Sequence, residues 1–310
     1  MNPIENDRQE SIKNPSRRNL IASAAGAAAA LTLGGGGAVM AGESSSSSKD
    51  IGANADAVRN GKLPQSVCQW CFKAWSIEEL AENAQKIGLK GVDLVDPDAF
   101  ETLKKHNLIG TMTKTHGITK GLNRKENWDE CLGKIRKAIE ATSAAGFRNV
   151  ICFSGNRAKQ SDEDGLKNCT EGIKKVIGQF EKKGVTLCME LLNSKVNHHD
   201  YQCDNSNWGV ELVKRVGSER FKLLYDIYHM QIMEGDVIAT IRKNHQYYAH
   251  YHTGGVPGRH EIDETQELYW PAIMRAIVET GFKGFVAQEF IPAHKDMIAS
   301  LAQAVQTCDV

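Results

Sequence analysis

The feature that most constrains the fold is a regular alternation of two kinds of segment from residue 63 onward. Apolar runs rich in β-forming residues recur eight times, and amphipathic helical segments separate most of them. Several runs are almost continuously apolar, as parallel strands are when helices cover one face and side chains fill the other. The predicted strands span residues 63–72, 91–96, 109–116, 149–154, 185–192, 221–228, 247–253 and 284–290.

Helical segments are predicted at residues 76–87, 128–145, 165–183, 207–216, 236–244 and 268–280. A glycine follows five of the helical segments just before the next strand, where it can adopt the left-handed conformation that ends a helix. These are Gly88, Gly146, Gly184, Gly217 and Gly281. Eight strands with interleaved helices over about 250 residues predict the α/β class and a (β/α)8 TIM barrel.

The alternative architecture is an open, doubly wound sheet. Such sheets usually carry a glycine-rich phosphate loop after the first strand. Here Phe72-Lys73-Ala74-Trp75 follows the first predicted strand instead. The barrel is therefore the favoured interpretation.

The first sixty residues do not share this alternation. Arg17-Arg18 precedes an apolar, alanine- and glycine-rich run from Leu20 to Ala41, which is typical of a twin-arginine export signal over residues 1–41. A membrane anchor, or an accidental arginine pair, is the alternative. Residues 42–60 include five consecutive serines and predict a flexible linker. We therefore expect the twin-arginine machinery to export the chain to the periplasm, anchored there if the signal is retained, with the barrel over residues 61–310.

The overall charge gives no sign of a polyanionic partner. The chain has 38 basic and 38 acidic residues, and residues 1–41 hold four of the former and three of the latter. Because nucleic-acid binding depends on a cationic surface, nucleic acid is not predicted as a partner. The oligomeric state stays open, a homo-oligomer included.

Eight cysteines follow the signal, an even number that in an exported chain invites a disulfide interpretation. Cys152 and Cys188, however, lie inside apolar runs, where a free thiol behaves as a small core residue. Cys68 and Cys71 have the spacing of a zinc or redox motif, but no second cysteine pair with zinc-site spacing accompanies them. They also lie on a predicted strand, where positions three apart face opposite sides. Buried thiols are the favoured interpretation.

The second half of the chain places a possible metal ligand near the end of each of its four predicted strands: Glu190, Asp226, His252 and Glu289. Functional groups of a barrel gather at the carboxyl ends of its strands, so these four side chains should converge. Any one of them could be a polar strand cap. Three carboxylates and an imidazole together suit Mg²⁺, Mn²⁺ or Co²⁺, and without a cation the carboxylates would repel one another.

Two motifs carry a resemblance to a known family. Tyr225–Gln231, followed by Met233-Glu234-Gly235, resembles the hydroxypyruvate isomerase family of the xylose-isomerase-like superfamily. Glu190-Leu191-Leu192-Asn193 is similar to the family's Glu-Pro-x-Asn, with a leucine in place of the proline. His252 stands where hydroxypyruvate isomerases often have Gln and sugar epimerases have His. The resemblance covers roughly residues 65–295 and implies a xylose-isomerase-like TIM barrel.

The resemblance also implies that Glu190 and Glu289 are both metal ligands and the catalytic acid–base pair. Elementary chemistry supports the same roles. A metal polarises a substrate carbonyl and its neighbouring hydroxyl, one carboxylate removes the α proton, and a carboxyl group returns a proton to the adjacent carbon. The expected function is isomerisation of a small hydroxy-carbonyl compound or sugar through an enediolate.

Three further residues are candidates for substrate binding. His229 could bond a substrate oxygen or could be structural. His116 ends the third predicted strand and faces the barrel mouth if strand parity holds. Arg259 lies in a loop similar to one in the family and could hold a carboxylate or a hydroxyl, or could be solvated. Residues 262–265 depart from the family pattern, which leaves the substrate open.

Other functions remain as rivals. A ketose epimerase, or a lyase acting on oxidised sugars, would use the same fold and a similar cluster. An endonuclease-IV-like phosphodiesterase would need more histidine and aspartate ligands and a basic groove, neither of which is evident. A non-catalytic sugar-binding barrel would have no need for a pair of glutamates flanking one pocket.

Overall fold

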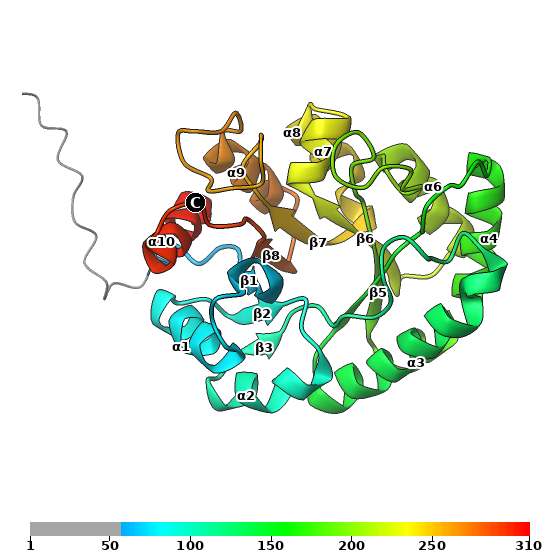
Figure 1. Cartoon of the computed structure of the whole chain (residues 1–310), viewed down its shortest axis with the longest axis horizontal. Helices are drawn as coiled ribbons and strands as arrows, with labels where there is room; N and C mark the ends of the chain where they lie inside the picture. The colour runs from blue at the N-terminus through cyan, green and yellow to red at the C-terminus, as the bar shows by residue number, and fades with distance from the viewer. Residues whose placement is uncertain (1–56) are drawn as a thin grey trace, which may run out of the picture. The chain divides into compact units, whose positions relative to one another are not determined.

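The computed structural model describes residues 57–310, which form an eight-stranded parallel sheet surrounded by helices (Figure 1). The strands are β1 Gln65–Cys68, β2 Gly91–Asp93, β3 Ile109–Gly110, β4 Asn149–Cys152, β5 Thr186–Glu190, β6 Phe221–Asp226, β7 Tyr248–Thr253 and β8 Phe285–Gln288. Their order in the sheet is β3-β2-β1-β8-β7-β6-β5-β4. The predicted (β/α)8 barrel is therefore confirmed.

The barrel closes between β3 and β4 through a single residue. The backbone of Thr113 forms isolated parallel bridges to Val95 and to Val150. Its N–H donates to the carbonyl oxygen of Asn149, and its own carbonyl accepts from the N–H of Ile151, each at 3.0 Å. The barrel is thus closed, but the pairing between the third and fourth strand segments is much shorter than the ladders between the other neighbouring strands.

The helices are α1 Ile77–Ile87, α2 Phe100–Lys105, α3 Trp128–Ala145, α4 Asp162–Lys174, α5 Ile177–Lys183, α6 Ser206–Val216, α7 Ile227–Met233, α8 Val237–Asn244, α9 Trp270–Glu279 and α10 Met297–Cys308. Four 3-10 turns add Gln69–Phe72, Pro97–Ala99, Lys125–Asn127 and His245–Tyr247. Local sequence explains the ends of α1. Ser76 and Glu79 form a reciprocal capping box, and Gly88 ends the helix at a φ of 92°.

Several predicted boundaries are wrong. The first predicted strand ends at Cys68, because the chain enters a 3-10 turn that carries Cys71. The predicted helix 165–183 is broken at Val176, whose φ is −126°. The sixth strand ends at Asp226 because the side chain of this residue accepts a hydrogen bond from the N–H of His229 and starts α7 at once.

The third predicted strand differs most from the structure. Of residues 109–116, only Ile109 and Gly110 belong to β3. All eight cysteines are buried and unpaired, as predicted.

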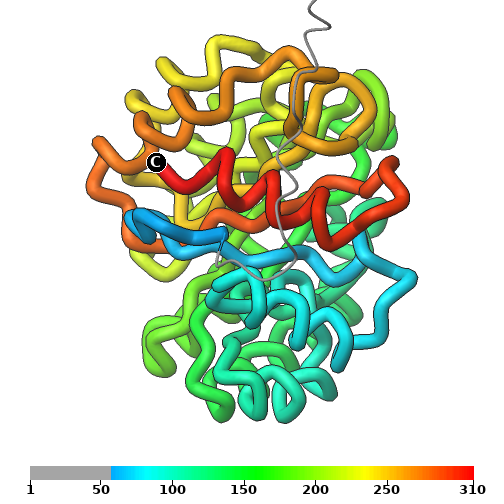
Figure 2. The backbone as a smooth tube through the Cα atoms, turned by 90° about the vertical axis from the view of Figure 1, so that its left-hand side faces the viewer, coloured from blue at the N-terminus to red at the C-terminus, as the bar shows by residue number. Residues whose placement is uncertain are grey.

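The two ends of the described domain lie together. Figure 2 shows the blue start of the domain beside the red α10. Backbone N–H groups of Asn60 and Gly61 donate to the carboxylate of Asp309 at 2.6 and 2.8 Å. The predicted signal, residues 1–41, and the predicted linker up to residue 56 lie outside the described residues. Within residues 57–310, no helix has the length and apolar character needed to cross a membrane.

Candidate active site

Four side chains converge at the carboxyl ends of consecutive strands. Glu190 and Asp226 are the last residues of β5 and β6, His252 is the penultimate residue of β7, and Glu289 follows β8 directly. One ligand atom from each lies within 4.8 Å of the others, and all four residues are buried. The structure therefore brings together the four residues that the sequence singles out, in an arrangement that could hold a metal ion.

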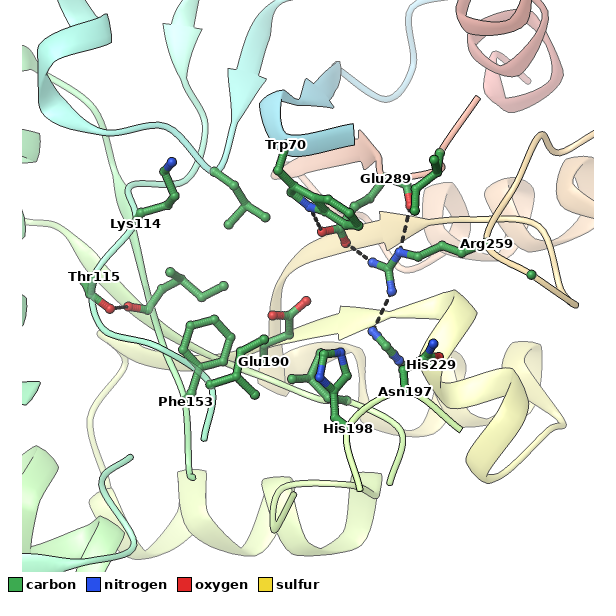
Figure 3. A pocket seen from close by; sticks show the side chains of 16 residues that line it. Trp70, Lys114, Thr115, Phe153, Glu190, Asn197, His198, His229, Arg259 and Glu289 are labelled. Carbon is green, nitrogen blue, oxygen red and sulfur yellow. Dashed lines mark hydrogen bonds and ion pairs between the residues drawn. The ribbon is translucent and has the colours of Figure 1, made fainter. Parts of the chain in front are cut away.

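A cavity of about 520 Å³ opens onto this cluster. Glu190 and Glu289 line it, together with Trp70, His229 and Arg259 (Figure 3). Asp226 and His252 are fully buried and do not line it. The two glutamates can thus reach a bound molecule, whereas the other two members lie beneath them.

An apolar wall makes up much of the remaining lining of the cavity. It consists of Leu94, Ile118, Ile151, Phe153, Leu192 and Ile291. Lys114 reaches the rim, where its ammonium group lies 2.6 Å from a carboxylate oxygen of Asp96. A bound molecule would therefore meet both ionisable groups and apolar side chains.

The imidazole of His252 is oriented by hydrogen bonding on one side only. Its Nε2 lies 3.0 Å from Oδ1 of Asp93. Its Nδ1 lies 3.4 Å from Glu190 Oε1 and 3.9 Å from Asp226 Oδ2, and it contacts Glu289 Oε2.

Within residues 57–310, Nδ1 of His252 is one of the few buried polar side-chain atoms without a hydrogen-bond partner. Burial lowers the pKa of His252, but Glu289 and the other neighbours outweigh burial and raise this pKa well above its usual value, so positive charge is favoured at this nitrogen. This arrangement fits a divalent cation.

Arg259 reaches into the same cluster. Its Nη2 lies 2.7 Å from Asp226 Oδ2 and also contacts Glu289 Oε2. The guanidinium carbon lies 4.8 Å from the ring centroid of Tyr228 and 5.6 Å from that of Trp70. Only 7% of the residue is exposed, so Arg259 is not a solvated loop residue.

Glu261 anchors the loop that carries Arg259 through hydrogen bonds of its side chain. The carboxylate of Glu261 accepts hydrogen bonds from the N–H groups of Ala293 and His294, at 2.9 and 3.0 Å, and from the hydroxyl of Ser300 at 2.9 Å. Burial opposes ionisation of Glu261, but these donors outweigh it and lower its pKa. The loop is therefore tied to the segment that follows β8.

His229 stands between Arg259 and a side chain that follows β5. Its Nδ1 lies 2.7 Å from the amide nitrogen of Asn193, and its Nε2 lies 2.5 Å from Nη1 of Arg259. Burial and the nearby guanidinium lower the pKa of His229 well below its usual value. Because both neighbours present N–H groups, a second proton on the ring would have no acceptor there, and the neutral ring is favoured.

The carboxyl groups of the cluster differ in their protonation. Burial opposes ionisation of Glu289, but Arg259 and His252 outweigh it and hold its pKa at about 2. Burial raises the pKa of Asp226 to about 7, although Arg259 partly opposes this effect. Burial also raises the pKa of Glu190, and the charge of Glu289 adds to the shift. Glu289 is thus held in its ionised form, whereas burial favours the protonated forms of Glu190 and Asp226.

Two tryptophans that follow β1 have different positions relative to the cavity. The indole N–H of Trp70 donates to Glu289 Oε1 at 2.6 Å, and its ring lines the cavity. Trp75 does not line the cavity and stacks on Phe72, with ring centroids 5.2 Å apart.

His116 also does not line the cavity. Its Nδ1 lies 3.0 Å from the carbonyl oxygen of Gly117, and its Nε2 lies 3.4 Å from the backbone nitrogen of Phe153. Strand parity does not extend to His116, because the regular strand ends at Gly110. The expectation that it faces the barrel mouth is not met.

Sequence reasoning missed two further residues of the site. Asp93, the last residue of β2, bonds His252, and its position at a strand end was the available signal. His198 lines the cavity, with its ring centroid 5.2 Å from that of His229. It follows β5 by several residues, so strand spacing gives no signal for it.

Fold and site together define a parallel eight-stranded barrel with a buried carboxylate–imidazole cluster at the carboxyl ends of its strands. Residues 72–306 match the xylose isomerase-like TIM barrel family. This match covers most of the chain, and the chain belongs to that family.

Curated relatives of the chain include isomerases. A putative hydroxypyruvate isomerase of Homo sapiens is 24% identical over 220 residues, which cover 69% of this chain and 75% of the relative. A 2-oxo-tetronate isomerase of Cupriavidus necator is 27% identical over 161 residues, which cover 52% and 61%. These similarities indicate an isomerase or epimerase of the same superfamily.

The fold recurs in solved structures. A crystal structure described as an AP endonuclease, family 2, from Brucella melitensis superposes with a TM-score of 0.69 and 24% sequence identity. The match covers 78% of this chain and 98% of that one. At this identity the likeness supports the fold alone.

Proposed function

We propose that the chain is a divalent-metal-dependent isomerase of a small hydroxy-carbonyl compound or sugar, with chemistry close to that of hydroxypyruvate isomerases. The observation that carries this proposal is the division within the cluster. Glu190 and Glu289 line the cavity, while Asp226 and His252 lie buried beneath them. A site that only held a cation, or only bound a sugar, would have no need to present two carboxylates to the bound molecule.

The ligand set suits Mg²⁺, Mn²⁺ or Co²⁺, because three carboxylates and one imidazole are mostly hard oxygen donors. When bound, the cation would polarise the substrate carbonyl and stabilise the negative charge that develops on the substrate oxygens. Glu190, Asp226, His252 and Glu289 would hold it. The metal-binding role of the cluster and its catalytic role are separate parts of the proposal.

The residues that line the cavity would carry out proton transfer and substrate binding. One of the two glutamates removes the proton from the carbon next to the carbonyl, which gives an enediolate. The other glutamate then gives a proton to the former carbonyl carbon, and the proton of the neighbouring hydroxyl passes to the former carbonyl oxygen, so that the carbonyl group moves by one carbon. Arg259 and His229 border the same space and can bond substrate oxygens. The apolar wall limits the access of water to the enediolate.

An epimerase is the second candidate. His252 occupies the position where, by resemblance, sugar epimerases carry histidine. Epimerisation uses the same two carboxylates but returns the proton to the original carbon from its opposite face. Product analysis separates the two, because an isomerase moves the carbonyl group and an epimerase does not.

The acid–base roles are tested with isosteric variants. Glu190→Gln and Glu289→Gln keep an oxygen ligand but lose the ability to accept a proton. With Mn²⁺ at saturation, we expect proton exchange from deuterated water into the substrate to fall by about 10²–10⁴-fold. Hydroxypyruvate, ketoses and 3-keto-sugars would be screened first on the wild type.

Asp226→Asn is the matched control, because it removes a ligand charge without removing a proposed base. Once saturated with Mn²⁺, it should keep more activity than either glutamate variant. Exchange at the wild-type rate in Glu190→Gln and Glu289→Gln would refute the acid–base assignment.

We also propose that the chain is exported to the periplasm by the twin-arginine route. The support is the arginine pair before the apolar run of residues 20–41. Replacing Arg17 and Arg18 by lysine should leave the protein in the cytoplasm, as fractionation would show. Unchanged export of this variant would rule out the route.

A further inference from the structure

Asp93 is a fully buried carboxylate inside the barrel, on the far side of the His252 ring from the three cluster carboxylates. Its Oδ1 lies 3.0 Å from Nε2 of His252, and its Oδ2 lies 2.9 Å from Nε2 of His250. The hydroxyl of Thr111 also donates to Oδ2. Oδ1 therefore bonds His252 and Oδ2 bonds Thr111, whereas Nε2 of His250 lies close to Oδ2 without forming a hydrogen bond.

This contact joins strands that are not neighbours in the sheet. Asp93 ends β2, whereas His252 belongs to β7, and β1 and β8 separate them in the strand order. The hydrogen bond therefore crosses the interior of the barrel. It is independent of the β6–β7 ladder, in which His252 pairs with Asp226.

We infer that Asp93 is a positioning residue of the metal centre. It accepts a hydrogen bond from the Nε2–H of His252 and so leaves Nδ1 unprotonated toward Glu190, Asp226 and Glu289. An imidazole has two ring nitrogens, and the hydrogen bond at one decides which of them can bind a metal. Without Asp93, the ring could take the other tautomer or rotate.

A competing interpretation uses the same residues. Cys68, Asp93 and His252 also place one ligand atom each within 4.8 Å of one another, so they could hold a cation of their own. In that arrangement Nε2 of His252 would be a ligand and could not donate to Asp93. The hydrogen-bond interpretation is favoured because Asp93 is already bonded by Thr111, and because Nδ1 rather than Nε2 of His252 lacks a hydrogen-bond partner.

The inference rests on the metal centre of the proposed function and not on its isomerase activity. Loss of such an outer hydrogen bond typically weakens metal binding by about 10–100-fold. We therefore expect Asp93→Asn, in the full chain, to raise the Kd for Mn²⁺ by about 10–100-fold in calorimetric titration. Thr111→Val is the matched control, since it removes a neighbour of Asp93 that does not touch His252, and its Kd should stay near the wild-type value.

A measurement on the wild type keeps the test independent of variant folding. In ¹⁵N NMR spectra of the Mg²⁺-loaded protein, Nε2 of His252 should carry the proton and Nδ1 should not. An unprotonated Nε2, or a Kd unchanged in a folded Asp93→Asn, would overturn the inference. Absorption by a Co²⁺–thiolate pair, lost in Cys68→Ser, would overturn it in favour of the competing site.

Failure of the proposed function gives a different result. A wild type that binds no Mn²⁺ or Mg²⁺ would refute the metal centre itself, and the role of Asp93 with it. A wild type that binds Mn²⁺ but exchanges no substrate protons would refute only the isomerase. The effects on Kd and on the His252 proton would then still stand.

Discussion

The two halves of the barrel contribute different parts of the site. Strands β5–β8 are four to six residues long, and each brings one member of the carboxylate–imidazole cluster. Strands β2 and β3 have only three and two residues, and the segments after β2, β3 and β4 supply much of the apolar wall. One half therefore holds the carboxylate–imidazole cluster, and the other half supplies most of the apolar wall.

The difference follows from what each task demands. A cation site needs ligand atoms held to within a fraction of an ångström, which continuous ladders provide; Asp226 and His252, for instance, are paired residues of β6 and β7. A wall needs only shape, so irregular backbone serves it. The contacts that join the halves at the site include those from Trp70 to Glu289 and from Asp93 to His252.

The largest expected effect is that of metal removal. Because a catalytic cation contributes several kcal/mol to the transition state, and about 1.4 kcal/mol is tenfold in rate, chelation should lower turnover by at least about 100-fold. Mn²⁺ should restore turnover. Steady-state assays before and after dialysis against a chelator measure both effects.

Amide hydrogen exchange would show whether the metal acts on one half. At a metal concentration 100 times Kd, openings that release the metal become about 100-fold rarer. We expect this slowing in β5–β8 and little change in the local openings of β3 and β4. Equal slowing in both halves would break the division between them.

The same division explains how much of the fold could be predicted. Strand five and strand seven are close to their predicted bounds, because long apolar runs that end in polar residues are strong signals. The third strand was predicted to reach His116, but its continuous pairing with β2 stops at Gly110. The segment is apolar enough to predict a strand, yet Thr113 alone in it forms a β-bridge to β4. This pairing depends on the tertiary structure, which the periodicity of the sequence does not reveal.

The site shows a similar limit. Spacing along consecutive strands was enough to bring Glu190, Asp226, His252 and Glu289 together. It gave no indication that Asp93, on a distant strand, bonds His252 across the barrel interior. Contacts across the interior depend on ring closure and strand tilt, which one sequence does not reveal. For this reason the cluster was predictable and its supporting residues were not.

The smallest expected effects come from one matched pair of substitutions. Trp70→Phe keeps an aromatic ring at the cavity and removes only the indole N–H that bonds Glu289. A hydrogen bond to a charged group contributes at least about 1.5 kcal/mol. We use this lower value because Arg259 still contacts Glu289 in the variant. We therefore expect kcat to fall by about tenfold, with little change in KM.

Phe153→Leu changes a residue of the apolar wall and no member of the cluster. Replacing one apolar side chain by another of similar size weakens binding by less than about 1.5 kcal/mol. The loss affects the bound substrate and the transition state equally, so KM should rise by less than about tenfold while kcat stays the same. Steady-state kinetics of both variants on one substrate give the two patterns side by side. If Phe153→Leu lowers kcat as far as Trp70→Phe does, the wall takes part in the chemistry, and the division between the two halves is wrong.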